Sequence, residues 1–374
     1  MLTSSNLRRP TREEVLMRTQ LLVVLLLLCF SLPLAAAVDR VQLTLDTSEA
    51  DQVLAILALR SQGKAVPDSE WQKLFATAPY QRLKLREKAI GERFHDPSRA
   101  FTDDDFKRFV LSADLLPRAA ALSSTLDRWK KADLQQDANR VLGYLPAEAT
   151  IHAKVYPVIK PQINTFVWDT SSDPTIFLYL DPEVSREKFE NTVTHELHHI
   201  GLGSVGPVYD KKIAALPEPV HTAADLMGAF GEGFAMLAAA GGPDVDPHAA
   251  SSPMEHARWE HDMGQFNGDL RAVNQFFLDI LNAKFANNDA IGEKAGSFFG
   301  DAQGPWYTVG YKMSVMVEKR FGRPALIGTM LDPRCLLVLY NRAAAEQNAA
   351  GKPLLPLWSE DVLAAVHAGN CGSQ

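Results

Sequence analysis

One short stretch of the chain, "NTVTHELHHIGLGS" (191–204), places three histidines and a glutamate within five positions. On a helix, which turns about 100° per residue, His195 and His199 would project only about 40° apart, so both imidazoles could bind one ion. Glu196 would lie about 60° from His199, where it could touch a metal-bound water without being a ligand. His198 would point about 100° away from His199, and we expect it to stay outside the site.

The spacing H-E-x-x-H is typical of zinc hydrolases, in which two histidines hold the ion and the glutamate acts as a base. Zinc lowers the pKa of its bound water toward ~7, and a carboxylate can then take the proton and pass it to the leaving amine. We therefore predict one Zn²⁺ ion bound by His195 and His199, with Glu196 as the general base. The alternative is a solvated histidine cluster on the surface of a helix.

A catalytic zinc ion usually has three protein ligands and one open position, so a third ligand is needed. The extended motif with a third histidine is absent, because Leu202 and Val205 occupy its glycine and histidine positions. Glu232 is the best candidate: it is a lone acid in a run of small and apolar residues, where an unpaired buried carboxylate would be costly. The alternative is a surface glutamate beside a glycine kink. Glu218 and the segment "EHARWEH" (255–261) are weaker candidates.

The surrounding pattern predicts the elements that position these side chains. Apolar residues at helical spacing (Phe189, Val193, Leu197 and Ile200) predict that the motif lies on a helix with one face in a core. Short runs rich in β-branched and aromatic residues predict a small sheet. These runs are 150–159, 164–170 and 175–180. In the last run, we expect Ile176, Leu178 and Leu180 to point to one face of the sheet and Phe177 and Tyr179 to the other. Helical patterns cover 47–145, 222–241, 254–283 and 305–321, with shorter helices at the C-terminus, and "capping boxes" are expected at Ser48–Asp51 and Thr102–Asp105.

The N-terminus has the features of a secretory signal peptide. Four arginines precede the apolar run Leu21–Phe30, and the small residues Ala35 and Ala37 follow it. We expect cleavage near Ala37–Val38 and a secreted or periplasmic mature protein. An uncleaved anchor is the alternative, but the run falls short of the 18 or more residues that span a bilayer.

Composition narrows the class of protein further. The chain has 374 residues, of which 46% are apolar and 22% charged, as in ordinary globular proteins. Without the four arginines and two glutamates of residues 1–37, the 34 basic and 43 acidic residues give a formal net charge of −9. Nucleic acid is therefore a poor partner. After export, Cys335 and Cys371 could form a disulfide or remain two separate thiols.

The motif and the residues after it resemble the gluzincin clan of zinc metallopeptidases. H-E-x-x-H is followed about thirty residues later by "GEGFA" (231–235). More narrowly, the chain is similar to bacterial domain-of-unknown-function families described as zinc-dependent peptidases. That likeness extends through "GPWYTVGYKMSVMVEKRFGRPALIGTMLDP" (304–333) and covers most of the mature chain. It implies zinc at His195, His199 and Glu232, Glu196 as general base, and an edge strand, "TIFLYL" (175–180), that could pair with an extended peptide.

Hydrolysis of an amide also requires a hydrogen-bond donor for the oxyanion. Tyr307 and Tyr311 lie one helical turn apart in "PWYTVGYKM", and we favour Tyr307 because it stands at the expected helix start, where its phenol can lean into a cleft. Aromatic core packing is the alternative for either residue.

Taken together, the sequence predicts a predominantly helical α+β fold. We expect a signal peptide (1–37), a helical N-terminal subdomain (38–145), and a zincin-like metallopeptidase domain (146–374) with a small mixed sheet. The leading hypothesis is an exported zinc peptidase that acts on peptides or proteins, without a stable membrane anchor after cleavage. The alternatives are an inert metal- or protein-binding module of the same shape, and a zinc hydrolase of a non-peptide amide or ester.

Overall fold

The computed structural model describes residues 40–93, 95–169, 172–300, 303–351, 354–366 and 371. The expected signal peptide and its cleavage position lie outside the described residues. From Val41 onward, the contacts of the chain form a single unit. The boundary expected between residues 145 and 146 stays a prediction.

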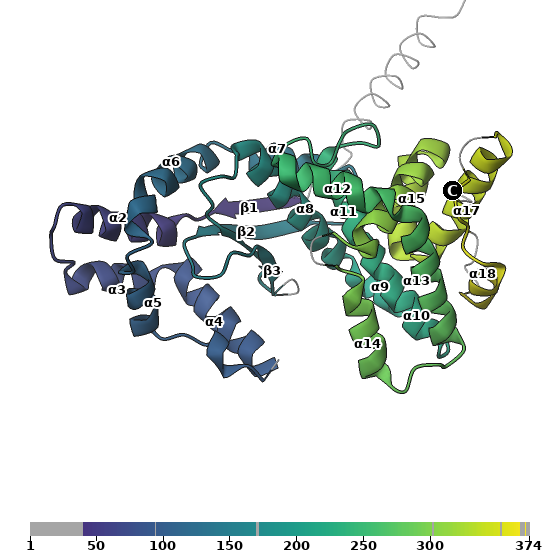
Figure 1. The fold of residues 1–374 in the computed structure, drawn as a ribbon, viewed down its shortest axis with the longest axis horizontal. Helices are drawn as coiled ribbons and strands as arrows, with labels where there is room; N and C mark the ends of the chain where they lie inside the picture. The colour runs from purple at the N-terminus through teal and green to yellow at the C-terminus, as the bar shows by residue number, and fades with distance from the viewer. Residues whose placement is uncertain are drawn as a thin grey trace, which may run out of the picture. The chain divides into compact units, whose positions relative to one another are not determined.

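A four-stranded mixed sheet has the strand order β1-β2-β4-β3. β1 (Val41–Leu45) and β2 (Ile151–Val158) are parallel and lie side by side (Figure 1), β4 (Thr175–Tyr179) is parallel to β2, and β3 (Phe166–Trp168) is antiparallel to β4. β2, β3 and β4 confirm the sequence prediction. β1 was not predicted, because five residues carry little pattern and its ladder depends on a partner more than 100 positions away.

The expectation that "TIFLYL" (175–180) forms the edge strand is wrong. β4 is hydrogen-bonded to β2 on one side and to β3 on the other. The short segment Phe166–Trp168 returns antiparallel and pairs with Thr175–Phe177, so β3 takes the edge position. The alternating pattern of β4 does not show that β3 pairs with it, because this antiparallel pairing depends on the loop between the two strands.

The alternation predicted within β4 is confirmed by its burial. Ile176 and Leu178 belong to the main core, whereas Phe177 packs on the opposite face with Tyr156 and Val158. Both faces of the strand are therefore covered, as expected for an inner strand with parallel pairing on one side.

Helices dominate the part of the chain between β1 and β2, as predicted. The expected "capping box" of Thr102 and Asp105 is present. The one expected at Ser48 is wrong. Ser48 is the first residue of the helix, the side chain of Thr47 at the N-cap position makes no capping hydrogen bond, and the Ser48 N–H donates to the carboxylate of Asp46. The helices are α2 (Ser48–Ser61), α3 (Asp68–Ala76), α4 (Ala78–Arg93), α5 (Asp103–Val110), α6 (Ala119–Trp129) and α7 (Leu134–Leu142).

After β4 the described residues form helices joined by turns and loops, with no further strand among them, which confirms an α+β fold that is mainly α. α11 packs against both α8 and α15, and α8 also contacts α7 and β2. The helices are α8 (Arg186–Ser204), α9 (Gly206–Ile213), α10 (Val220–Met227), α11 (Gly231–Ala240), α12 (Pro253–Gly264), α13 (Phe266–Leu281), α14 (Asn288–Ser297), α15 (Pro305–Phe321), α16 (Arg323–Gly328), α17 (Arg334–Ala349) and α18 (Glu360–Val366). Two 3₁₀ turns, η3 (Gly228–Phe230) and η4 (Thr329–Leu331), precede α11 and α17.

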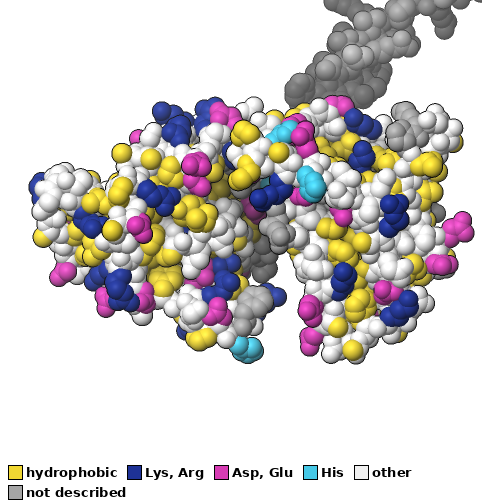
Figure 2. All heavy atoms as spheres, in the orientation of Figure 1, with side chains coloured by type: hydrophobic (Ala, Val, Ile, Leu, Met, Phe, Trp, Pro, Cys, Tyr) yellow, Lys and Arg dark blue, Asp and Glu magenta, His cyan; other side chains and the backbone are white. Residues whose placement is uncertain are grey.

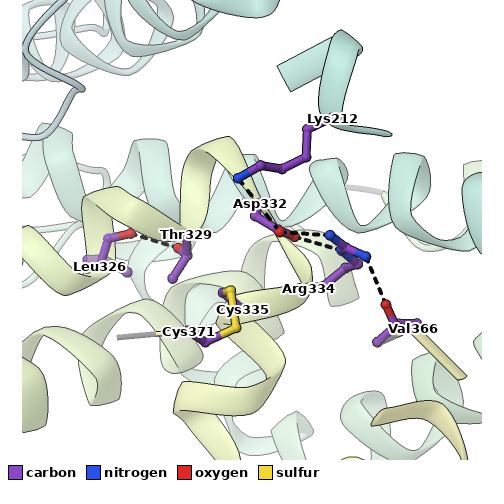
Figure 3. The surroundings of a disulfide bond; sticks show 8 residues. All are labelled: Lys212, Leu326, Thr329, Asp332, Arg334, Cys335, Val366 and Cys371. Atoms are coloured by element: carbon purple, nitrogen blue, oxygen red, sulfur yellow. Dashed lines mark hydrogen bonds and ion pairs between the residues drawn. A yellow bond between two sulfur atoms is a disulfide. The ribbon is translucent and has the colours of Figure 1, made fainter. Parts of the chain in front are cut away.

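Cys335 and Cys371 form a disulfide, with sulfurs 2.11 Å apart and Cα atoms 5.2 Å apart (Figure 3). It joins Cys371, near the C-terminus, to α17. Of the two alternatives left open by the sequence, a disulfide or two separate thiols, the structure therefore has the disulfide. Beside it, the buried guanidinium of Arg334 donates to the carboxylate of Asp332 and to the carbonyl of Val366.

Basic and acidic side chains are interspersed over the face drawn in Figure 2. Among the described residues, no helix has the length and apolar character needed to cross a bilayer.

Candidate metal centre

The helix α8 is built as its sequence predicts, and it carries the H-E-x-x-H motif near its middle. Ser185 caps it by accepting a hydrogen bond from the N–H of Lys188. The apolar stripe is buried, with Phe189, Val193 and Leu197 completely inaccessible to solvent. The adjoining face therefore remains available, and His195 and His199 lie on it, each only partly buried.

The structure brings together His195, His199 and Glu232. The two Nε2 atoms are 3.0 Å apart, and Glu232 Oε2 lies 3.2 Å from His195 Nε2 and 3.3 Å from His199 Nε2. Among the described residues, these three form the one group of His, Cys, Asp or Glu side chains whose ligand atoms converge closely enough to hold a metal ion.

The triangle of donor atoms fits a zinc ion. A circle through the three atoms has a radius of about 1.8 Å, so a point about 0.9 Å above their plane lies ~2.0–2.1 Å from all three. That is the usual zinc–ligand distance. Two imidazoles and a carboxylate are also a known donor set of catalytic zinc sites, and three ligands leave a fourth position open.

The carboxylate of Glu232 and the imidazole of His199 stabilise each other's charged forms. Burial by itself would raise the pKa of Glu232, but the charge of His199 and hydrogen bonds to both imidazoles hold that pKa far below its usual value. Burial by itself would lower the pKa of His199, but the carboxylate of Glu232 raises it to about 9. Glu232 is thus held as a carboxylate, the form that binds a metal ion.

Glu232 reaches the histidines because α11 lies very close to its neighbours. Gly233, the next residue, has no space for a side chain: a Cβ there would overlap backbone atoms of Tyr307, Gly310 and Tyr311 on α15. A Cβ on Gly310 would in turn lie 2.5 Å from the carbonyl oxygen of Phe230. Two glycines thus set the distance between α11 and α15. The role of Gly310 was not predicted from the sequence, although an isolated glycine inside a helical pattern often has a packing reason.

His198 lies outside the triangle, as the helical geometry predicts, and the place of Glu196 beside a metal-bound water stays a prediction. Glu196 is partly exposed, and its carboxylate makes no hydrogen bond or ion pair with another residue that the structure describes. His198 is completely buried, and its ring stacks on Phe234 with centroids 5.1 Å apart. Burial lowers the pKa of His198 well below its usual value, with a further contribution from neighbouring imidazoles. His198 is not part of the triangle.

The two tyrosines of α15 diverge. Tyr307 faces the triangle: its ring lies parallel to that of His195 with centroids 6.4 Å apart. Burial and the negative charge of Glu232 raise the pKa of Tyr307, so its hydroxyl keeps its proton and can donate it in a hydrogen bond. Tyr311 instead lies against Trp259 and donates to the carbonyl of Val245.

The competing acids have other partners. Glu218 is exposed and binds the side chains of His221 and Thr222. In the 255–261 segment, His256 pairs with Asp246 at 2.7 Å. Neither group approaches the triangle closely enough to complete it.

Comparison with known proteins gives one match. No curated protein and no solved structure matches the chain. A family model matches residues 71–349, which include every residue of the triangle as well as Glu196 and Tyr307. The chain therefore belongs to the family described as "putative zinc dependent peptidase" (DUF5700).

Proposed function

We propose that this protein is an exported zinc-dependent peptidase that holds one zinc ion on His195, His199 and Glu232. The observation that carries the proposal is the convergence of three donor atoms from α8 and α11 into a triangle with sides of 3.0–3.3 Å. A bound zinc ion would supply Lewis-acid chemistry, lowering the pKa of a coordinated water and polarising the substrate carbonyl.

Glu196 is the proton carrier in this proposal. It follows His195 on α8, and its carboxylate has no competing hydrogen bond or ion pair within the described part of the chain. It can take a proton from the attacking water as the C–O bond forms. It then delivers the proton to the amide nitrogen as the C–N bond breaks, so that the products are a carboxylic acid and an amine.

Tyr307 is the donor for the carbonyl oxygen. The phenol is partly buried beside Glu232 and stays protonated, because its pKa is raised by burial and by the carboxylate. A hydrogen bond from this hydroxyl strengthens as negative charge develops on the oxygen, which favours the transition state over the bound substrate.

Export is supported by two independent features. The N-terminal sequence has the arginines, apolar run and small residues of a signal peptide. The Cys335–Cys371 disulfide is typical of proteins in oxidising compartments. We propose a secreted or periplasmic protein cleaved near Ala37–Val38. N-terminal sequencing of the exported protein tests this, and a mature chain that still begins at the first residues would contradict it.

The test of the chemistry is metal analysis of the mature chain combined with digestion of an unbiased peptide library. We expect one zinc ion per chain and cleavage that a chelator abolishes. Glu196→Gln should retain the zinc and lose at least ~10³-fold in turnover, because the proton carrier is gone while the ligands remain. Glu187→Gln, an exposed change on the same helix, should retain both zinc and turnover.

Three other results would each contradict a part of the proposal. Zinc without cleavage in the wild-type chain would contradict the peptidase proposal and favour an inert metal-binding module. Cleavage that survives Glu196→Gln would remove this residue from the mechanism. Cleavage that survives removal of the metal would contradict the metal-dependent chemistry.

A further inference from the structure

A cavity of about 360 Å³ lies directly beside the metal triangle, and the proposed function does not use it. Its wall is formed by the end of α8, by α9 and α10, by η3 and the start of α11, and by η4 and the start of α17. This volume is at the small end of the range for ligand sites. It is large enough for one side chain of a substrate.

The cavity shares a wall with the metal site. His199 lines it, and Gly203, one helical turn further along α8 on nearly the same face, lines it as well. The start of α11, which carries Glu232, forms the adjacent wall through Gly231 and Phe234. A group in this cavity would therefore sit next to any bond that reacts at the metal.

The lining of the cavity is mainly apolar. It includes the large apolar side chains of Leu202, Met227, Phe230, Phe234, Met330 and Leu336, and the polar side chains in it are those of His198, His199, Tyr209, Asp225 and Thr329. Among the described residues that line it there is no lysine or arginine, and the one carboxylate is that of Asp225, which is exposed. A positively charged group would lose its hydration in this cavity without gaining a buried carboxylate as a partner, because Asp225 is exposed.

We propose that this cavity is the specificity pocket of the peptidase and takes a bulky apolar side chain of the substrate, leucine- or phenylalanine-like, next to the bond that is cleaved. The inference rests on the proposed function and adds the class of substrate to it. Burial of an apolar side chain against these walls supplies binding energy next to the reacting carbonyl, which positions the bond.

The part of the wall that carries Met330 and Leu336 is held in place. In the sequence these two residues enclose Asp332, Arg334 and Cys335, and Figure 3 shows Arg334 bound to Asp332 and Cys335 joined to Cys371. A wall fixed by a buried ion pair and a disulfide keeps its shape when the cavity fills. Discrimination by size is therefore expected, rather than adaptation to any side chain.

Gly203 offers a way to fill the cavity without disturbing the fold. A Cβ at this position meets no atom within 4 Å, and the residue lies in a helix, where glycine is unfavourable. The series Gly203→Ala, Gly203→Val and Gly203→Leu should reduce the space beside His199 stepwise. The matched control is Gly292→Leu in α14, an exposed helical glycine that likewise has no atom within 4 Å of a Cβ and does not line the cavity.

The experiment compares peptides that differ only in the residue flanking the cleaved bond. In the wild-type chain, library cleavage should be enriched at bonds flanked by leucine, phenylalanine or methionine. Gly203→Leu should lower kcat/KM for the phenylalanine peptide at least tenfold, and should change kcat/KM for the alanine peptide less than threefold. Zinc content should not change, and Gly292→Leu should behave as the wild type.

Binding gives a readout that does not need turnover. In the zinc-loaded Glu196→Gln protein, calorimetry should show tighter binding of the phenylalanine peptide than of the alanine peptide, and Gly203→Leu should abolish the difference. Cleavage without apolar enrichment, or an equal loss for both peptides in Gly203→Leu, would overturn the pocket while leaving the peptidase proposal intact. Absence of cleavage together with selective apolar binding would support the pocket and contradict the peptidase proposal.

Discussion

Replacing Gly233 with alanine should damage the metal site without touching any metal ligand. The added methyl group would overlap backbone atoms of α15, and backbone cannot move aside as the end of a flexible side chain can. To restore contact distances of ~3.5–4.0 Å between carbon atoms, α11 and α15 must separate by more than ~1 Å at this point.

The size of the effect depends on that displacement. Overpacking of this kind costs ~1–3 kcal/mol, and alanine returns ~0.5–1 kcal/mol because glycine is unfavourable within a helix. The net loss of stability should be about 0–2.5 kcal/mol, so the variant should fold. Glu232 is the adjacent residue, however, and zinc–ligand distances tolerate only ~0.2 Å. We therefore expect zinc affinity to fall at least tenfold and turnover about 100-fold, the cost typical of a 1 Å misplacement.

The assay is a zinc titration against a competing chelator, combined with urea unfolding. Gly231→Ala is the matched control, because Gly231 flanks Glu232 on the other side and a Cβ there meets nothing within 4 Å. The control should retain wild-type zinc affinity and stability. If Gly233→Ala bound zinc as tightly as Gly231→Ala does, the close approach of α11 and α15 would not be what positions Glu232, and this reasoning would be refuted.

Three further predictions concern separate parts of the structure. Tyr307→Phe should lower turnover 10- to 1,000-fold while zinc content and KM are retained. Tyr311→Phe, whose ring lies against Trp259, should leave turnover unchanged in the same assay, and equal effects of the two changes would show that neither hydroxyl has a specific role. Cys371→Ser should lower the free energy of unfolding by about 4 kcal/mol, the chain-entropy estimate for a disulfide spanning 36 residues, and a reductant should then have no additional effect on urea unfolding. Burial raises the pKa of Glu49 to about 8, so the folded chain keeps a proton that the unfolded chain loses above about pH 4.5. The free energy of unfolding should therefore fall as pH rises from about 4.5 to 8, and Glu49→Gln should reduce the difference between unfolding measured at pH 5 and at pH 8.

The local elements were largely predictable, because their causes are local. The stripe of Phe189, Val193, Leu197 and Ile200 specified both the helix and its buried face, and the relative directions of His195 and His199 came from helical geometry alone. The assignment of alternate residues of β4 to its two opposite faces was likewise predicted from the sequence pattern.

Pairings between distant segments were predicted less well. The position of β1 in the sheet depends on a ladder with β2, and the position of β4 as an inner strand depends on the return of β3. Neither fact is encoded in the pattern of a single strand, since a strand's own residues show which faces are buried but not which edges are occupied.

The sequence by itself determined which side chains could share an ion, because two of them lie on one helix whose repeat is fixed by the backbone, and because an acid in an apolar run needs a partner. Only the tertiary structure decided that Glu232 reaches them, that Tyr307 rather than Tyr311 faces them, and that an apolar cavity adjoins them. These outcomes depend on how closely α8, α11 and α15 approach one another. That distance is set by packing between residues far apart in the chain, with two glycines at the point of closest contact.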